Sequence, residues 1–355
     1  MPNTIYELYN APAVGAYWNE MQSDAAPLLG ESLFPAKRVL GLDLSWIKGA
    51  NGLPAALAPS AFDAKPTIRT RESIDVEKAK MPFFRESMRI GEEERQQLLQ
   101  LIAAGGTYAN VIVTKLFDDA TTLINSALVV PEAMRFSLLQ TGAITISSAL
   151  SGGQNVNYSY NYDANGTWAD SNLKNAQTNW ADENADPVED IIAIKQAASE
   201  NGVELTRAIV APAVWAKLRK SAAIRQAVST VGTSVAISDN TLREFLIAET
   251  GITFTVYSKR YKTFDGTDAP YMMSDRVVFL PEQPVGSTCF GTTPEEADLM
   301  SGNTDCDVEI VGNGIAVLTK KESLPVNVIT AVSEIVLPSF EAMNSVYVLI
   351  ANPAL

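Results

Sequence analysis

The chain has 355 residues, of which 46% are hydrophobic and 19% are charged, which is typical of a globular protein with one large domain or two to three modest ones. It contains no histidine, so Ser–His and Cys–His catalysis and histidine-based metal sites are excluded. The formal net charge of −14 argues against non-specific binding to nucleic-acid phosphates.

Two further features bound the cellular setting. Cys289 and Cys306 are the only cysteines in the sequence, and such sparse use is typical of a reducing cytoplasm, so we expect no structural disulfide. The sequence has no apolar run of the length that spans a membrane, and the first residues predict no secretory signal.

Residues 1–36 carry four acidic residues and no basic one, and prolines at positions 2, 12, 27 and 35 interrupt them. Only Val14 to Met21 could form a short helix. We therefore predict an N-terminal arm with little core of its own, which lies either on the body of the protein or on a neighbour.

Residues 37–89 carry ten basic residues against six acidic ones, and apolar side chains are sparse. Apolar residues partly alternate at residues 39–47, a stretch rich in Gly, Pro and Ala follows at residues 49–59, and the alternation returns at residues 67–71 and 73–77. This pattern predicts two long strands joined by a loop, that is, a protruding ribbon. A two-stranded ribbon is only marginally stable in water, so a partner surface is expected, although a solvated ribbon without a partner is the alternative. The residues expected to contact another subunit are Lys65, Arg69, Arg71, Lys78 and Lys80.

Two helices are predicted next. The first begins near Glu92 and ends at Gly105, and the second runs from about Thr107 to Gln140 with one apolar stripe. Pro131 is expected to kink the second helix or to restart it.

A hairpin is predicted from residues 143–147 and 156–162, with tyrosines at positions 158, 160 and 162 on one face. These rings could stack on nucleic-acid bases, but no lysine or arginine lies between residues 136 and 173 to bind phosphates, which disfavours that function.

Residues 178–300 read as a compact α/β unit. Asp186 and Pro187 start a helix that stops at Asn201-Gly202, and Gly251 closes another that starts at Ser238. A further helical stretch is predicted at residues 214–228, strands at residues 207–211, 252–258 and 276–280, and a polar hairpin near residues 264–267. Three strand-like runs follow, at residues 308–319, 326–337 and 346–351.

No motif in the chain predicts catalysis. Gly312-Asn313-Gly314 resembles the start of a dinucleotide fingerprint but is followed by no helix, and is expected to be a turn. The acids of residues 305–309 fit no calcium loop, and the paired acids at 118–119 and 182–183 suit solvated helix surfaces. We predict a protein that is not an enzyme and has neither a cofactor nor a metal site.

The order of these parts resembles that of tailed-bacteriophage major capsid proteins, in particular the lambda-like major capsid protein E family. Four stretches carry the likeness: residues 42–49 (LDLSWIKG), 81–90 (MPFFRESMRI), 139–146 (LQTGAITI) and 178–191 (TNWA followed by DPVEDI). The resemblance covers nearly the whole chain, and the order of the motifs is stronger evidence than any single motif.

The resemblance implies the α+β Hong Kong 97-type capsid fold. It implies an N-terminal arm (1–36), an extended E-loop (37–89), a peripheral domain with a long spine helix (90–177, joined by 301–325) and an axial α/β domain (178–300, completed by 326–355). The implied function is structural, and no cross-linking pair or maturation-cleavage signal is identified in this sequence.

In that function, copies assemble into hexamers and pentamers of an icosahedral head around double-stranded DNA, in a virion made in the bacterial host cytoplasm. The expected partner is another copy of the same chain, and decoration, scaffolding and portal proteins are further candidates. The chain is expected to lie near packaged DNA without binding it specifically, and no contact with a membrane is expected. The basic ribbon would lie across the acidic body of an adjacent copy.

Other functions remain open from the sequence. An encapsulin-like compartment would have the same fold but would enclose enzyme cargo and lack nuclease-protected DNA. A carboxylate-based hydrolase would be a monomer or small oligomer with a deep acidic cleft, and a tail-tube subunit would stack into open tubes.

Overall fold

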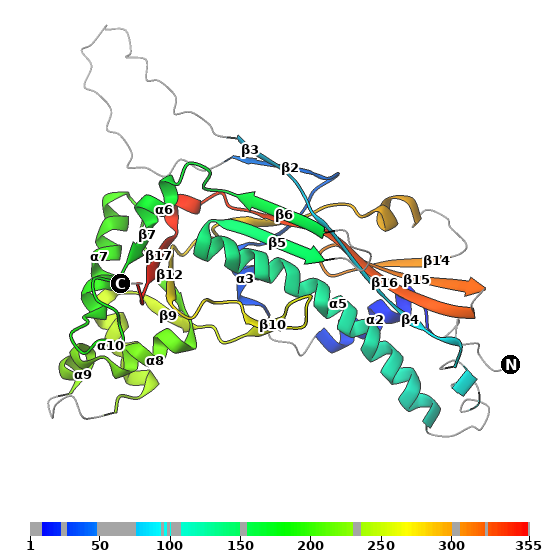
Figure 1. Ribbon diagram of the computed structural model, residues 1–355, viewed down its shortest axis with the longest axis horizontal. Coiled ribbons are helices and arrows are strands. Elements are labelled where there is room, and N and C mark those ends of the chain that lie inside the picture. Colours follow the sequence, from blue (N-terminus) through cyan, green and yellow to red (C-terminus); the bar gives the residue numbers. More distant parts are fainter. Residues whose placement is uncertain are drawn as a thin grey trace, which may run out of the picture. The chain divides into compact units, whose positions relative to one another are not determined.

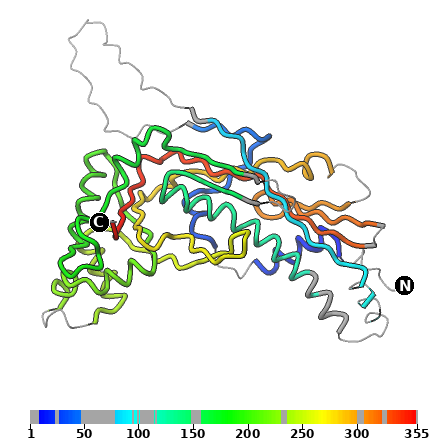
Figure 2. Tube along the Cα trace, in the orientation of Figure 1, coloured from blue at the N-terminus to red at the C-terminus, as the bar shows by residue number. Residues whose placement is uncertain are grey.

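The structure is a computed structural model that describes residues 9–22, 27–47, 76–93, 96–97, 100, 108–149, 155–229, 236–299, 306–323 and 326–353. The chain divides into two compact units. The first unit comprises Met1–Leu44, Lys78–Met134 and Ser287–Ser339, and the second comprises Ser45–Glu77, Arg135–Gly286 and Phe340–Leu355. Figure 2 follows the chain through these stretches.

The first unit is built on a six-stranded sheet in the order β1-β13-β16-β15-β14, in which β4 also pairs with β16. Its strands are β1 (Ala36–Arg38), β4 (Phe83–Ile90), β13 (Ser287–Phe290), β14 (Cys306–Val311), β15 (Ile315–Ser323) and β16 (Val326–Ser339). The long strand β16 organises the sheet, because it pairs in antiparallel register with β15, β4 and β13 (Figure 1). Among the described strands of this sheet, β1 and β13 are the one pair in parallel register.

The N-terminal arm packs on its own chain. It forms helix α2 (Ala11–Gln22) and helix α3 (Leu29–Leu33). Val14 is fully buried and Trp18 is 5% exposed, and both belong to the core that α2 shares with the sheet. The predicted alternatives were an arm on the body of the protein or on a neighbour, and the structure shows the first. The residues at positions 11, 14, 15 and 18 are buried and form one helix face, so the predicted short helix begins earlier than Val14.

Helix α5 (Tyr108–Thr141) is the predicted long helix, and its residues contribute to both units. The predicted stripe is confirmed where it is described, because Ala120, Leu123 and Ile124 are buried in the first unit's core. Pro131 lies inside the helix and does not restart it. A proline in a helix costs about 3 kcal/mol, which the burial of the adjoining turns can offset.

The second unit contains a five-stranded sheet in the order β7-β17-β12-β8-β9. Its strands are β7 (Leu173–Asn175), β8 (Arg207–Val210), β9 (Thr253–Val256), β12 (Arg276–Leu280) and β17 (Tyr347–Ile350). Its helices are α6 (Thr167–Asn172), α7 (Pro187–Glu200), α8 (Pro212–Lys220), α9 (Ala222–Val228), α10 (Asp239–Thr250) and a 3-10 turn (Met343–Ser345). The predicted compact α/β character of this region is seen directly.

The helix-boundary predictions in the second unit are confirmed. The Asp186 carboxylate accepts hydrogen bonds from the amides of Val188 (3.1 Å) and Glu189 (3.3 Å) at the start of α7. Gly251 closes α10 with a φ of +69°, the left-handed conformation that glycine adopts easily. The helical stretch predicted after Val214 divides into two helices at Ser221, which caps the second of them.

Three two-stranded sheets complete the described chain. They are β2 (Asp43–Ile47) with β3 (Val76–Lys80), β5 (Ala143–Ala149) with β6 (Asn155–Asn161), and β10 (Arg260–Lys262) with β11 (Asp268–Pro270). The last two match predicted hairpins. The short strands β1, β7 and β13 were not predicted, and most of the helix expected after Glu92 lies outside the described residues.

The units divide the chain differently from the expected domains. Residues 326–355 were grouped with the axial domain, but β16 belongs to the first unit's sheet and β17 to the second unit's sheet. Both strands are largely buried, so burial does not distinguish them and only their pairing partners do.

Candidate assembly surfaces

The basic ribbon is described only at its stem. Lys65, Arg69 and Arg71 lie outside the described residues. Lys78 and Lys80 lie on β3 with exposed side chains. The division between the two units passes through both β2 and β3, after Leu44 and after Glu77. The structure therefore places two of the five predicted contact residues on a narrow strand pair.

The stem of the ribbon is the strand pair β2 and β3. The segments next to these strands, at Gly41 and Met81, approach Gly291 of the first unit closely. The Met81 amide donates to the Leu42 carbonyl at 2.8 Å, and the Met81 side chain is buried. A Cβ at Gly291 would lie 2.9 Å from the Gly41 oxygen, 2.9 Å from the Met81 Cε and 2.7 Å from the Ile335 Cγ2. Only a residue without a side chain permits this close approach.

In the second unit, the stem has a separate aromatic contact. The Trp46 ring stacks on the Tyr162 ring with centroids 4.9 Å apart and an interplanar angle of 27°. Both side chains are buried, so the stacked pair anchors Trp46 in this unit. Trp46 lies in one of the stretches that carried the family resemblance.

One face of the first unit's sheet packs on α2 and α5, and the opposite face is the candidate assembly surface. We call it the outer face. Its residues form three rows across the sheet, set by strand register: Arg89–Ile329–Lys320, Ser87–Ala331–Leu318–Val308 and Arg85–Ser333–Ala316–Ile310. Ile329, Ala331, Leu318, Val308 and Ile310 are half-buried, whereas Arg89 and Lys320 are exposed. The outer face thus has an incompletely covered apolar centre and a charged rim.

A π-helix, Glu295–Leu299, covers one end of the outer face. Glu295 is 4% exposed, forms an ion pair with Arg85 and accepts a hydrogen bond of 2.8 Å from the Ser333 hydroxyl. Glu296 forms a second ion pair, with Arg38. A nearly buried carboxylate needs such partners, and these contacts hold the π-helix on the sheet.

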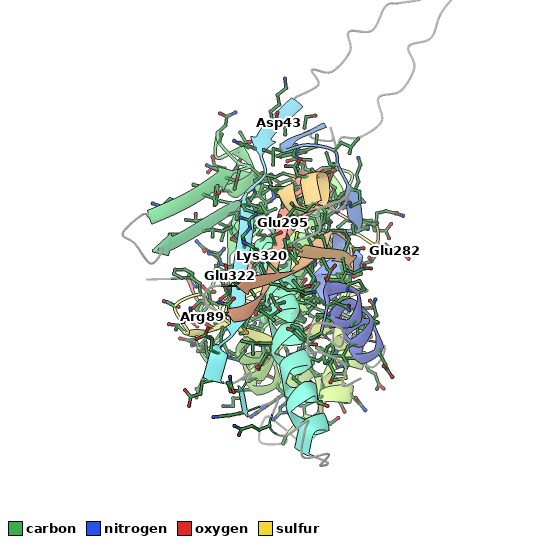
Figure 3. The ribbon with its side chains drawn as sticks, turned by 90° about the vertical axis from the view of Figure 1, so that its right-hand side faces the viewer. Asp43, Arg89, Glu282, Glu295, Lys320 and Glu322 are labelled. Carbon is green, nitrogen blue, oxygen red and sulfur yellow. The ribbon has the colours of Figure 1, made fainter. Side chains whose placement is uncertain are left out.

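A cavity of about 340 Å³ lies beside the π-helix, lined by residues that include Arg85, Glu295, Asp298 and Leu318. Figure 3 shows Glu295, Lys320, Glu322 and Arg89 following one another along this side of the first unit. Arg85 and Glu295 are 210 positions apart in the sequence, so no local pattern could have identified this arrangement.

Two stretches that carried the family resemblance bind neighbouring chain segments in the second unit. The Gln140 side chain is fully buried, donates to the Tyr271 carbonyl at 3.0 Å and accepts from the Met273 amide at 2.6 Å. The Asp190 carboxylate accepts from the Trp180 indole at 2.8 Å and from the Gln177 amide at 3.1 Å. Their roles are therefore structural.

No group of three or more potential metal-ligating side chains occurs among the described residues, and no described helix is long and apolar enough to cross a membrane. Gly312 and Gly314 have positive φ angles in the turn between β14 and β15, which confirms the predicted turn. Cys289 is buried and Cys306 is half-buried, and the structure records no disulfide between them.

The fold defines a class of protein. Across nearly the whole chain it is similar to three solved structures. One is a prophage protein of Escherichia coli CFT073 described as a candidate capsid protein (14% identity, 96% of this chain and 99% of that chain, TM-score 0.57). The others are the capsid of cyanophage A-1(L) (11%, 92% and 92%, 0.51) and a phage-related protein of Bordetella bronchiseptica RB50 (11%, 97% and 99%, 0.50). The chain therefore has the mixed α+β fold of Hong Kong 97-type capsid proteins.

A model of the family described as phage major capsid protein E matches residues 10–310. The chain belongs to this family, and it is a structural protein of the phage head and not an enzyme. No match to the chain is found among curated protein sequences. The sequence-based recognition of the family is confirmed.

Proposed function

We propose that copies of this chain form hexamers and pentamers that close into an icosahedral head around double-stranded DNA. Membership of the capsid family carries this proposal, and the half-buried outer face supports it, because a partly covered apolar surface favours a protein neighbour. The acidic net charge would keep packaged DNA mobile at the wall.

Negative-stain imaging of the purified protein tests the proposal. Closed shells are expected, with nuclease-protected DNA in particles recovered from infected cells. A monodisperse 38.3 kDa species at every concentration would contradict the proposal. Shells that contain protein cargo and no DNA would favour the encapsulin-like alternative.

Within the proposed shell, the arm is residues 1–36, the E-loop is residues 37–89, the peripheral domain is residues 90–177 with the strands of 301–325, and the axial domain is residues 178–300. Residues 326–355 divide between the two sheets as β16 and β17. The basic stem strand β3 and the length of α5 support the second and third assignments. Decoration, scaffolding and portal proteins would bind the assembled head.

The ribbon of one copy is proposed to lie on the outer face of the next. Lys78 and Lys80 are exposed on β3, and Asp298 is exposed on the π-helix that covers one end of the outer face, so the charges are complementary. Lys65, Arg69 and Arg71 would extend the same contact. Because these charges are solvated, high salt should weaken the contact.

Charge reversal tests this contact. The variant Lys78→Glu/Lys80→Glu should raise the protein concentration needed for half-assembly, and the variant Asp298→Lys should do the same to a smaller extent. Adding Asp298→Lys to Lys78→Glu/Lys80→Glu should restore part of the assembly, because attraction is re-formed with inverted sign. The variant Lys220→Glu/Lys262→Glu is the control, since it makes the same change in net charge at exposed positions of the second unit.

The triple variant Lys65→Glu/Arg69→Glu/Arg71→Glu should abolish shells while leaving the subunits soluble. Normal shells from this variant, or no rescue in the combined variant, would refute the electrostatic contact while leaving the shell proposal intact.

A further inference from the structure

The hairpin β5–β6 stands alone as a sheet. Its strands pair from Ala143↔Asn161 to Ala149↔Asn155, and within the described chain no third strand joins them (Figure 1). An isolated two-stranded hairpin is marginally stable in water. Three-stranded pairing, or cover by another surface, is what usually stabilises such a unit.

The hydrogen-bond register identifies which backbone groups point outward. The Tyr162 amide donates to the Gly142 carbonyl at 3.0 Å, so residues 142 and 162 form a hydrogen-bonded pair. Pairing alternates along an antiparallel ladder, so Thr145↔Ser159 and Ser147↔Asn157 are non-hydrogen-bonded pairs whose N–H and C=O groups face away from the hairpin.

Ala143 supports this register, because its backbone groups also lie off the ladder. Its N–H donates to the Thr141 hydroxyl at 3.2 Å, and its C=O accepts from the Ser137 hydroxyl at 2.7 Å. In the part of the chain that the structure describes, the outward backbone groups of residues 145, 147, 157 and 159 have no such partner. The hairpin therefore presents two rows of unused donors and acceptors.

Neither edge carries the features that normally prevent strand addition. Proteins protect exposed edges with charged residues, prolines or covering segments. No Asp, Glu, Lys, Arg or Pro occurs from Phe136 to Tyr162. The side chains of Thr145, Ser147, Asn157 and Ser159 are exposed, small or medium-sized and polar. Burial raises the pKa of Tyr160 to about 12, with a smaller contribution from Tyr158, so its phenol is neutral as well.

The chemistry of the hairpin indicates which kind of partner can bind its edges. With no cation in this stretch, nucleic acid has no phosphate contact to make. The exposed polar face does not suit a lipid surface. In a shell built from one chain, the surface at the highest local concentration is another copy, and an edge that offers both donors and acceptors fits any extended strand.

We propose that a strand from a second copy of this chain pairs with the main chain of the β5–β6 hairpin, along one of the hairpin's two open edges. The pairing adds a third strand and stabilises the hairpin in the assembled particle. This inference rests on the shell function proposed above.

Single prolines test the pairing. Thr145→Pro and Ser159→Pro each remove one outward N–H from a different edge without removing a bond of the hairpin's own ladder. Thr145→Ala and Ser159→Ala keep the N–H and are the matched controls. The proline at the paired edge should raise the concentration for half-assembly at least about tenfold, because one lost hydrogen bond per contact recurs at every contact in the particle. The alanine variants should assemble as wild type does.

A second measurement does not depend on the variants. Hydrogen exchange of the wild-type chain should show the amides of one outward pair, 145 and 147 or 157 and 159, exchanging rapidly in free subunits and protected in particles. The inward amides of Ile144 and Ile146 should be protected in both states and serve as the internal reference.

The possible results distinguish a failure of the strand pairing from a failure of the shell function. If wild-type particles form while both proline variants assemble normally and the outward amides stay unprotected, the pairing is refuted and the shell function stands. If pairing and protection appear only when other phage proteins are added, a second copy is the wrong occupant and the proposal is refuted. If the wild-type chain never forms particles, the proposed function itself fails.

Discussion

The two main sheets of this protein differ in how completely their own chain covers them. In the second unit, the central strands β8, β12 and β17 are buried over nearly their whole length. In the first unit, α2 and α5 cover one face, and the outer face remains half-buried with a charged rim. A subunit that must assemble can thus combine a self-sufficient α/β unit with a unit whose sheet is only partly covered.

The largest loss of stability from a single side-chain truncation is expected in the second unit. Trp168 is 1% exposed, and its indole donates to the Val346 carbonyl at 3.1 Å. Trp168→Ala should lower the free energy of unfolding by about 3–5 kcal/mol, measured by guanidinium denaturation. Phe264→Ala is the control, because that ring is 68% exposed and should cost less than about 0.5 kcal/mol. Equal effects of the two variants would contradict the described core.

Substitutions in the N-terminal arm test whether the arm stabilises the first unit. Trp18→Ala removes a buried ring and its hydrogen bond of 3.0 Å to the Asn125 side chain, and should cost about 3 kcal/mol. Limited proteolysis should then cleave near α2 much faster than in wild type. Met21→Ala, on the same helix but 54% exposed, should leave both measurements almost unchanged. A protease-resistant arm in Trp18→Ala would show that α2 is held elsewhere.

A smaller loss of stability is expected at Gly291, where the stem of the ribbon contacts the first unit. Gly291→Ala places a Cβ against the Gly41 oxygen and the Met81 Cε, and overpacking of this kind costs about 1–3 kcal/mol. Hydrogen exchange of residues 76–93 should accelerate. Adding Met81→Ala should relieve only part of the loss, because the backbone contact with Gly41 remains. Complete rescue by Met81→Ala would contradict the close backbone approach.

The smallest effect concerns the π-helix on the outer face. Ser333→Ala removes one hydrogen bond to the Glu295 carboxylate while Arg85 remains, and should cost about 1–2 kcal/mol in thermal or chemical unfolding. Ser87→Ala, at an exposed position of the adjacent strand, should be neutral. A neutral Ser333→Ala would mean that Arg85 alone satisfies Glu295.

The sequence by itself determined the local features that depend on neighbouring residues. It located the stripe of α5, the Asp186 cap, the Gly251 stop, the turn at Gly312–Gly314 and the β5–β6 hairpin, because periodicity and capping act within a few residues. The order of these parts, with four short motifs, was also enough to recognise the capsid family.

Only the tertiary structure decided what pairs with what. Burial of the arm, the division of residues 326–355 between β16 and β17, the close approach at Gly291 and the Arg85–Glu295 contact all join residues far apart in the chain. Short apolar strands look alike in sequence, and their partners are selected by the packing of the whole sheet. For the same reason, a strand edge that its own chain leaves open can be recognised only after every other pairing is known.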